Sequence, residues 1–252
     1  MNVAMMKDRV VLVTGASRGI GAATAKLLAA HGARVAVNYF QSEAAAQSVV
    51  NDIRAMDRRA IAVRADVRDA AQVRAMVAEV EREFGPVDTL VVNAAIGFPM
   101  RPFVEYEWSD FQAKLVGELG AAFNCCKAVV PGMRARRSGC IVAISSGLSR
   151  HPGLGFCAHS TAKSGLDAFV KSLALELGPE GIRVNTVAPG LTETDATAQV
   201  PVNHKEAMAG MTPLRRNGVP EDVAGAVLMV ASSHAQFLTG VYVPVSGGAL
   251  ML

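Results

Sequence analysis

Short apolar runs rich in β-branched residues alternate along the chain with longer segments whose apolar residues recur at helical spacing. Seven runs are typical of strands: 9–14, 33–39, 60–66, 88–94, 139–145, 182–188 and 240–245. Between them, segments such as 22–30 and 73–84 have an apolar helical face, and the second stops at Gly85-Pro86. Continuously apolar strands that alternate with helices belong to parallel sheets covered on both faces. The pattern therefore predicts an α/β fold: a single doubly wound domain over residues 1–252, with a seven-stranded parallel sheet and helices on both faces.

One segment departs from this alternation. Residues 191–218 follow the sixth predicted strand and have no clear period. Long connections in compact domains often serve as lids. We expect a substrate lid here.

The composition indicates an ordinary globular protein. Of 252 residues, 51% are hydrophobic and 19% charged, with a formal net charge of +3. No basic cluster favours nucleic acid, and the run at 134–137 is interpreted as a helix C-terminus. A leader pattern and a long apolar segment are both missing, so we expect a cytoplasmic protein without membrane association. Four cysteines lack metal-ligand spacing and are predicted to be free, largely buried thiols, with no metal site: Cys125, Cys126, Cys140 and Cys157.

A glycine-rich turn, TGASRGIG at 14–21, follows the first predicted strand and precedes a helix. Glycines let the backbone approach a pyrophosphate, and the helix N-terminus supplies unpaired N–H groups. The motif predicts a dinucleotide site formed by Gly15, Ser17, Arg18, Gly19, Ile20 and Gly21. A tight turn without a ligand is the alternative.

The end of the second strand indicates which dinucleotide binds. The stretch from Asn38 through Tyr39 to Ser42 contains no acid that would bind a ribose 2′-hydroxyl. Arg18 and Ser42 can both meet a 2′-phosphate, which favours NADP(H) over NAD(H), unless Arg18 simply projects into solvent. Asp66, after the third strand, is expected to bind the adenine amino group or else to cap the next helix.

With these features the chain resembles the short-chain dehydrogenase/reductase family, and within it the 3-oxoacyl-[acyl-carrier-protein] reductase branch. The resemblance runs from about residue 8 to the C-terminus and rests on TGASRGIG at 14–21, DV at 66–67, VNAA at 92–95, ISS at 144–146, RVNTVAPG at 183–190 and SGG at 246–248. It implies a Rossmann fold, association as a tetramer or dimer, and further cofactor contacts from Tyr39, Val67, Asn93, Lys163, Pro189, Gly190, Thr192 and Thr194.

The resemblance also implies four catalytic positions, of which two depart from the family pattern. Ser146 matches the serine that polarises the substrate carbonyl, and Lys163 matches the lysine that binds the nicotinamide ribose. His159 stands where the family has a tyrosine as proton donor. Glu118 stands where the family has an asparagine that holds a proton-relay water.

Chemically, a histidine can replace the tyrosine as an acid only when it is protonated. Lys163 would lower the pKa of His159 and Glu118 would raise it, so the two replacements compensate on this hypothesis. We expect a relay of Glu118, Lys163 and His159 that is most active at mildly acidic pH. The predicted activity is NADPH-dependent reduction of a ketone in an acyl or polyketide-type substrate, either free or bound to a carrier protein or CoA. Apolar residues in the loops after strands four and five suit such a substrate or serve packing, among them Phe98, Met100, Phe103, Leu148 and Phe156.

Three alternatives remain open. In the first, the His–Glu pair is an acid/base couple for dehydration or isomerisation. In the second, the chain is a cofactor-binding scaffold with little turnover. In the third, His159 is an inactivating substitution.

Overall fold

The computed structural model describes residues 4–251. The ends of the predicted domain, residues 1–3 and 252, lie outside these residues. Within the described range, seven strands form one sheet in which every neighbouring pair is parallel, in the order β3-β2-β1-β4-β5-β6-β7. The strands are β1 (Val10–Val13), β2 (Arg34–Tyr39), β3 (Ala60–Arg64), β4 (Thr89–Val92), β5 (Gly139–Ile144), β6 (Ile182–Pro189) and β7 (Tyr242–Val245). The predicted parallel sheet is confirmed.

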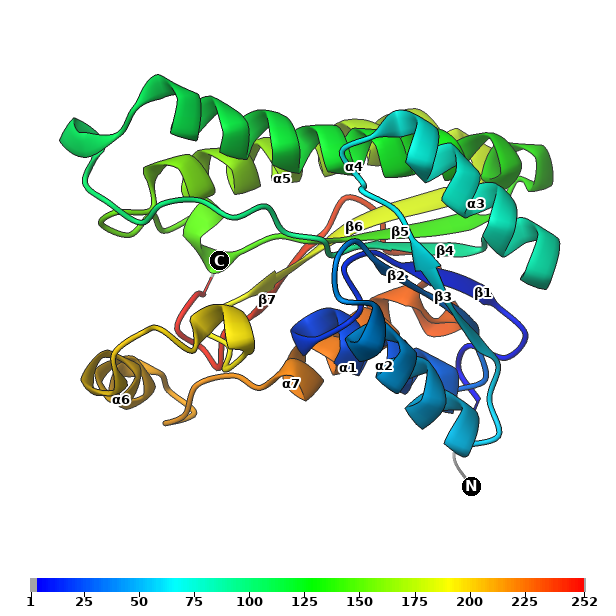
Figure 1. Cartoon of the computed structure of the whole chain (residues 1–252), viewed down its shortest axis with the longest axis horizontal. Helices are drawn as coiled ribbons and strands as arrows, with labels where there is room; N and C mark the ends of the chain where they lie inside the picture. The colour runs from blue at the N-terminus through cyan, green and yellow to red at the C-terminus, as the bar shows by residue number, and fades with distance from the viewer. Residues whose placement is uncertain (1–3, 252) are drawn as a thin grey trace.

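Helices cover both faces of this sheet, as Figure 1 shows. The α-helices of the described chain are α1 (Gly19–Ala30), α2 (Glu43–Ala55), α3 (Ala70–Phe84), α4 (Trp108–Arg136), α5 (Cys157–Leu177), α6 (Val202–Met211) and α7 (Pro220–Ala231). Helices α3, α4 and α5 pack on one face, and α1, α2 and α7 pack on the other. The protein therefore has the predicted doubly wound α/β fold.

Successive residues of a strand lie on opposite faces of the sheet, and helices cover both faces, which explains the continuous apolar runs. In β1, Val10 and Leu12 pack toward α3 and α4, whereas Val11 and Val13 pack toward α1 and α7. Both sets are buried. Each strand residue thus contributes to one of two cores, as expected for a parallel sheet between helical layers.

The order of the strands fixes where a ligand can bind. The chain runs outward from β1 through β2 to β3 and then returns to β4 on the other side of β1. In doubly wound sheets, ligands bind outside the carboxyl ends of the strands at such a switch point. The loops that follow β1, β4, β5 and β6 therefore form the ligand side of the sheet.

Two smaller predictions have different outcomes. The N-cap of α3 is Asp69, which accepts hydrogen bonds from the backbone of Ala71 and Gln72 at 2.8 and 3.1 Å, so the idea that Asp66 caps this helix is wrong. The four cysteines are free as predicted, with Cys157 half-buried and the others buried. Among residues 4–251, no helix is both long and apolar enough to cross a membrane.

Candidate active site

The glycine-rich turn joins β1 to α1 and has no room for a side chain at Gly15 or Gly21. A Cβ on Gly15 would lie 2.8 Å from Ala94 Cα, and one on Gly21 would lie 2.6 Å from Gly15 O. Gly15 and Gly19 have positive φ angles of 60° and 55°, which favour glycine. Ser17 and Ile20 are half-buried, whereas Arg18 is exposed at the N-terminus of α1. No side chain caps this helix end.

Two asparagines hold the turn in place. Asn93, directly after β4, donates from Nδ2 to Thr14 O at 2.8 Å and to Gly15 O at 3.0 Å. Asn38, in β2, accepts from Gly15 N at 3.1 Å. Asn93 was predicted to contact the cofactor, and the structure gives its amide a role in shaping the turn. The sequence analysis missed Asn38, although a buried asparagine in an apolar strand is a signal of such a role.

The residues predicted for the adenosine end lie at the carboxyl ends of β2 and β3. Tyr39 is buried and Ser42 is half-buried just before α2. Val67 is buried in the core. The Asp66 carboxylate accepts from Arg68 Nε at 2.9 Å and from Arg68 Nη2 at 2.7 Å, and these hydrogen bonds lower the pKa of Asp66. Asp66 is therefore an ionised acceptor at this edge, and its contact with adenine stays a prediction.

The segment after β6 lies against the glycine turn. A Cβ on Gly19 would lie 3.5 Å from Thr194 Cγ2. Pro189 ends β6, and Thr192 donates from its hydroxyl to Gly190 O at 3.2 Å. The predicted lid, 191–218, contains α6 and is closed at its base, where Gly218 N donates to Leu191 O at 2.9 Å.

The core of the candidate site is a buried chain of charges. Glu118 of α4 is bonded through Oε1 to Lys163 Nζ of α5 and through Oε2 to Lys114 Nζ, each at 2.6 Å. The three side chains are at most 5% exposed. Lys163 also donates to Ile144 O at 2.7 Å, at the end of β5. The structure thus brings together Glu118 and Lys163, which the sequence analysis paired.

His159 lies one turn before Lys163 on α5, between aromatic rings. Its imidazole stacks on Phe98 with centroids 4.9 Å apart and meets Phe156 edge-on at 6.2 Å. Nδ1 of His159 is buried without a hydrogen-bond partner among residues 4–251. Nε2 is therefore the ring nitrogen left to meet a ligand.

Two serines follow β5, and they differ in their surroundings. Ser146 follows β5 and is half-buried, with its hydroxyl accepting from Leu148 N at 3.2 Å. Ser145 is buried and faces the Lys163 backbone carbonyl at 3.5 Å. Ser146 is the more accessible of the two, and its catalytic role stays a prediction.

Electrostatics in this network favour a carboxylate and a neutral imidazole. Burial by itself would raise the pKa of Glu118, but the ammonium groups of Lys163 and Lys114 lower it to about 2. Burial, followed by repulsion from Lys163 and Lys114, lowers the pKa of His159 to about 3 despite the attraction of Glu118. The mildly acidic optimum was expected from Glu118 and Lys163 alone, and burial of the ring together with Lys114 shifts that balance toward neutral imidazole.

Lys114 is the charged residue that the sequence analysis missed. A lysine four residues before Glu118 on a predicted helix was the available signal. Such pairs are usually exposed, so only the structure shows that this one is buried beside the predicted catalytic lysine.

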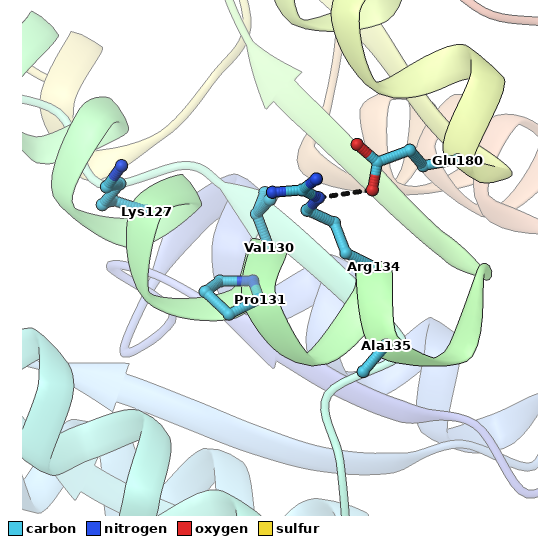
Figure 2. Close-up of a pocket in the computed structure, with 6 residues that line it drawn as sticks. All are labelled: Lys127, Val130, Pro131, Arg134, Ala135 and Glu180. Carbon is cyan, nitrogen blue, oxygen red and sulfur yellow. Dashed lines mark hydrogen bonds and ion pairs between the residues drawn. The ribbon is translucent and has the colours of Figure 1, made fainter.

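One cavity lies away from these residues. It has a volume of about 460 Å³ and is drawn in Figure 2 on the C-terminal half of α4, where Arg134 is bonded to Glu180. Its lining consists of Lys127, Val130, Pro131, Arg134, Ala135 and Glu180. None of these is a predicted site residue.

The sheet order and the glycine turn at its switch point define a Rossmann-like α/β protein. Residues 15–249 match the family described as "Enoyl-(Acyl carrier protein) reductase". The chain is 40% identical over 250 residues to the 3-oxoacyl-[acyl-carrier-protein] reductase of Staphylococcus aureus (strain Mu50), covering 98% of this chain and 100% of the relative. The corresponding Synechocystis sp. reductase is 41% identical over 246 residues, covering 96% of this chain and 97% of the relative. The chain belongs to the short-chain dehydrogenase/reductase family.

Another relative acts on a different class of molecule. The L-rhamnose 1-dehydrogenase (NAD(P)(+)) of Sphingomonas sp. is 40% identical over 248 residues, covering 97% of both chains. Overall sequence identity to these relatives therefore does not decide which substrate the chain binds or which dinucleotide it prefers.

Proposed function

We propose that the protein is an NADP(H)-dependent oxidoreductase that reduces the ketone of a 3-oxoacyl substrate to an alcohol, with His159 in the position of the family's tyrosine. The observation that carries this proposal is the buried chain from Lys114 through Glu118 to Lys163, one helical turn from His159. A site that had lost its activity would not explain three buried charges joined by short hydrogen bonds. The 3-oxoacyl reductases among the relatives support the substrate class.

The residues at the switch point fit a nicotinamide dinucleotide. The turn has no room for a side chain at Gly15 or Gly21, and the α1 N-terminus has no side-chain cap, which suits a pyrophosphate. Exposed Arg18 and half-buried Ser42 suit a 2′-phosphate, and the first acid beyond β2 is the exposed Glu43 at the start of α2. We therefore assign NADP(H) as the cofactor.

When bound, the reduced nicotinamide supplies a hydride to the carbonyl carbon. The protein's own task is to stabilise the negative charge that develops on the carbonyl oxygen, and the resulting alkoxide takes from water the proton that completes the alcohol. Neutral His159 donates an Nε2–H hydrogen bond to that oxygen, as a neutral imidazole can in other enzymes. Ser146 supplies a second hydrogen bond, and Lys163, held by Glu118 and Ile144 O, binds the nicotinamide ribose.

The surroundings of His159 suit an apolar acyl group. Phe98 and Phe156 contact the imidazole, and Met100, Phe103 and Leu154 are exposed in the neighbouring loops. Helix α6 of the predicted lid has no buried residue, which suits a segment that moves over a substrate. We propose that 191–218 closes over the acyl chain, whether it is carried by a protein or by CoA.

Self-association and location complete the proposal. Val116, Phe123 and Leu175 expose apolar side chains on α4 and α5, which supports association of copies as a tetramer or dimer. A cytoplasmic location stays a prediction.

The test is to follow NADPH absorbance with a 3-oxoacyl thioester from about pH 5 to about pH 9. We expect turnover by the parent protein and a loss of at least about 100-fold in kcat for His159→Phe. His151→Asn, which changes an exposed histidine, should keep the parent rate. Absence of turnover throughout this pH range would refute the proposed activity.

The same assay separates the alternatives. A scaffold would be stabilised against heat by NADPH yet show no turnover with either His159 or His159→Tyr. An impaired reductase would gain large activity in His159→Tyr, whereas a working histidine predicts a loss. Dehydration or isomerisation would change the thioester without consuming NADPH, and the dehydrogenases and reductases among the relatives do not favour it.

A further inference from the structure

Lys114 is built into the site more firmly than a surface lysine. Its side chain is 1% exposed, and Nζ donates to Glu118 Oε2 at 2.6 Å and to Ile96 O at 2.7 Å. Ile96 N in turn donates to the same Glu118 oxygen at 3.2 Å. One ammonium group thus joins α4 to the loop that follows β4.

Through these bonds Lys114 determines how Glu118 is held. Oε1 of the carboxylate meets Lys163, and Oε2 meets Lys114 and Ile96 N. Without Lys114, Oε2 would keep only the backbone donor, and the carboxylate would be free to turn. A buried carboxylate shared by two cations is fixed in charge and in orientation.

Lys114 also approaches the imidazole by a second path. Its Nζ lies 5.2 Å from the centroid of Phe98, and Phe98 stacks on His159 at 4.9 Å. Lys114 is therefore within roughly 10 Å of the imidazole across a single half-buried ring.

We propose that Lys114 is a positioning residue of this site, which fixes the Glu118 carboxylate between two ammonium groups and sets the net charge that His159 faces. The inference deepens the proposed function, since a neutral imidazole is the hydrogen-bond donor assigned there. It makes the glutamate and Lys114 a functional pair: the carboxylate holds Lys163, and the second lysine offsets the carboxylate's charge.

The charges that act on His159 come from two helices. In the described chain they are Lys163 of α5 and both Lys114 and Glu118 of α4, while the neighbouring loops contribute the rings of Phe98 and Phe156. The network therefore carries one net positive charge when the imidazole is neutral. Removing Lys114 makes the network neutral, and removing the charge of Glu118 makes it doubly positive.

Titration of His159 in three variants tests this charge balance. Histidine-labelled protein is followed by NMR from neutral pH down to the acid limit of the folded state, and His159→Gln identifies the signal. Lys114→Met should raise the pKa of His159 by about one pH unit, the effect of a unit charge at roughly 10 Å. Glu118→Gln should lower this pKa, and the double variant Lys114→Met/Glu118→Gln should return it to within about half a unit of the parent value.

Controls separate charge from packing. Lys127→Met removes an exposed lysine from the same helix and should leave the titration unchanged. If Lys114→Met fails to fold, Lys114→Gln makes the same charge change while keeping a donor for Glu118, and Lys114→Arg should titrate like the parent. An unchanged or lowered pKa of His159 in the neutral Lys114 variants would overturn the proposal. Since the measurement needs no substrate, this failure is distinct from an absence of reductase turnover.

Discussion

Replacing Glu118 with glutamine leaves two buried ammonium groups without their shared carboxylate. Glu118 is 3% exposed, with Lys114 and Lys163 each 2.6 Å from one of its oxygens. Its pKa falls from 4.5 to about 2 on folding, which corresponds to roughly 3 kcal/mol of stability at neutral pH. Breaking one side of a buried charge network typically costs about 3–5 kcal/mol, so both estimates agree. We expect Glu118→Gln to lower the free energy of unfolding by roughly 3 kcal/mol at pH 7.

The pH dependence of this loss follows from the direction of the shift. A carboxyl whose pKa is lower in the folded state stabilises the fold above its unfolded pKa, and this contribution disappears as the pH falls from about 4.5 through about 2. The difference between parent and variant should therefore shrink by about 1 kcal/mol between pH 7 and pH 4.

Urea unfolding followed by circular dichroism at the two pH values measures both quantities. The control is Glu83→Gln, which removes an exposed partner of Arg59 and should cost less than about 1 kcal/mol. If Glu118→Gln were as stable as the parent, or if its deficit did not depend on pH, the network would not be held by an ionised Glu118.

Three further predictions concern the cofactor and the thiols. Gly21→Ala forces a Cβ to within 2.5 Å of Asn93 Nδ2, so NADPH affinity measured by calorimetry should fall at least about tenfold, and unchanged affinity would contradict the close packing of the turn. Arg18→Ala should weaken NADPH binding by about tenfold while leaving NADH binding nearly unchanged, and equal losses for both would remove the assigned 2′-phosphate contact. In the native protein a thiol reagent should label half-buried Cys157 before Cys126, because burial raises the pKa of the Cys126 thiol. Peptide mapping identifies the labelled thiol, and labelling of Cys126 first would contradict its burial on α4.

The fold was predictable because each strand carries its own signal. Val10 to Val13 are apolar without interruption since both sheet faces are covered, and Gly85 ends α3 where the sequence indicated. Capping was less predictable: both Asp66 and Asp69 precede α3, and the choice between them depends on the backbone geometry of the loop, which composition does not reveal.

The site was predictable where spacing along one helix decides it. His159 and Lys163 are four residues apart on α5, so they had to lie on one face. Lys114 could not be assigned in the same way, because burial of a Lys–Glu pair depends on how α4 packs against α5 and the β4 loop. The expectation of a mildly acidic optimum took account of Glu118 and Lys163, but not of burial, which is the largest cause of the lowered pKa of His159, or of the second cation, Lys114.

The central claim is that neutral His159 donates the hydrogen bond in an NADPH-dependent reduction. The most direct measurement is kcat/KM for NADPH oxidation with a 3-oxoacyl thioester as a function of pH. Because the pKa of His159 is lowered to about 3, its imidazole stays neutral across roughly pH 5 to pH 8, and kcat/KM should vary by no more than about twofold over this range. A tenfold fall in kcat/KM for each pH unit across this range would show that imidazolium is the acid and would contradict the account.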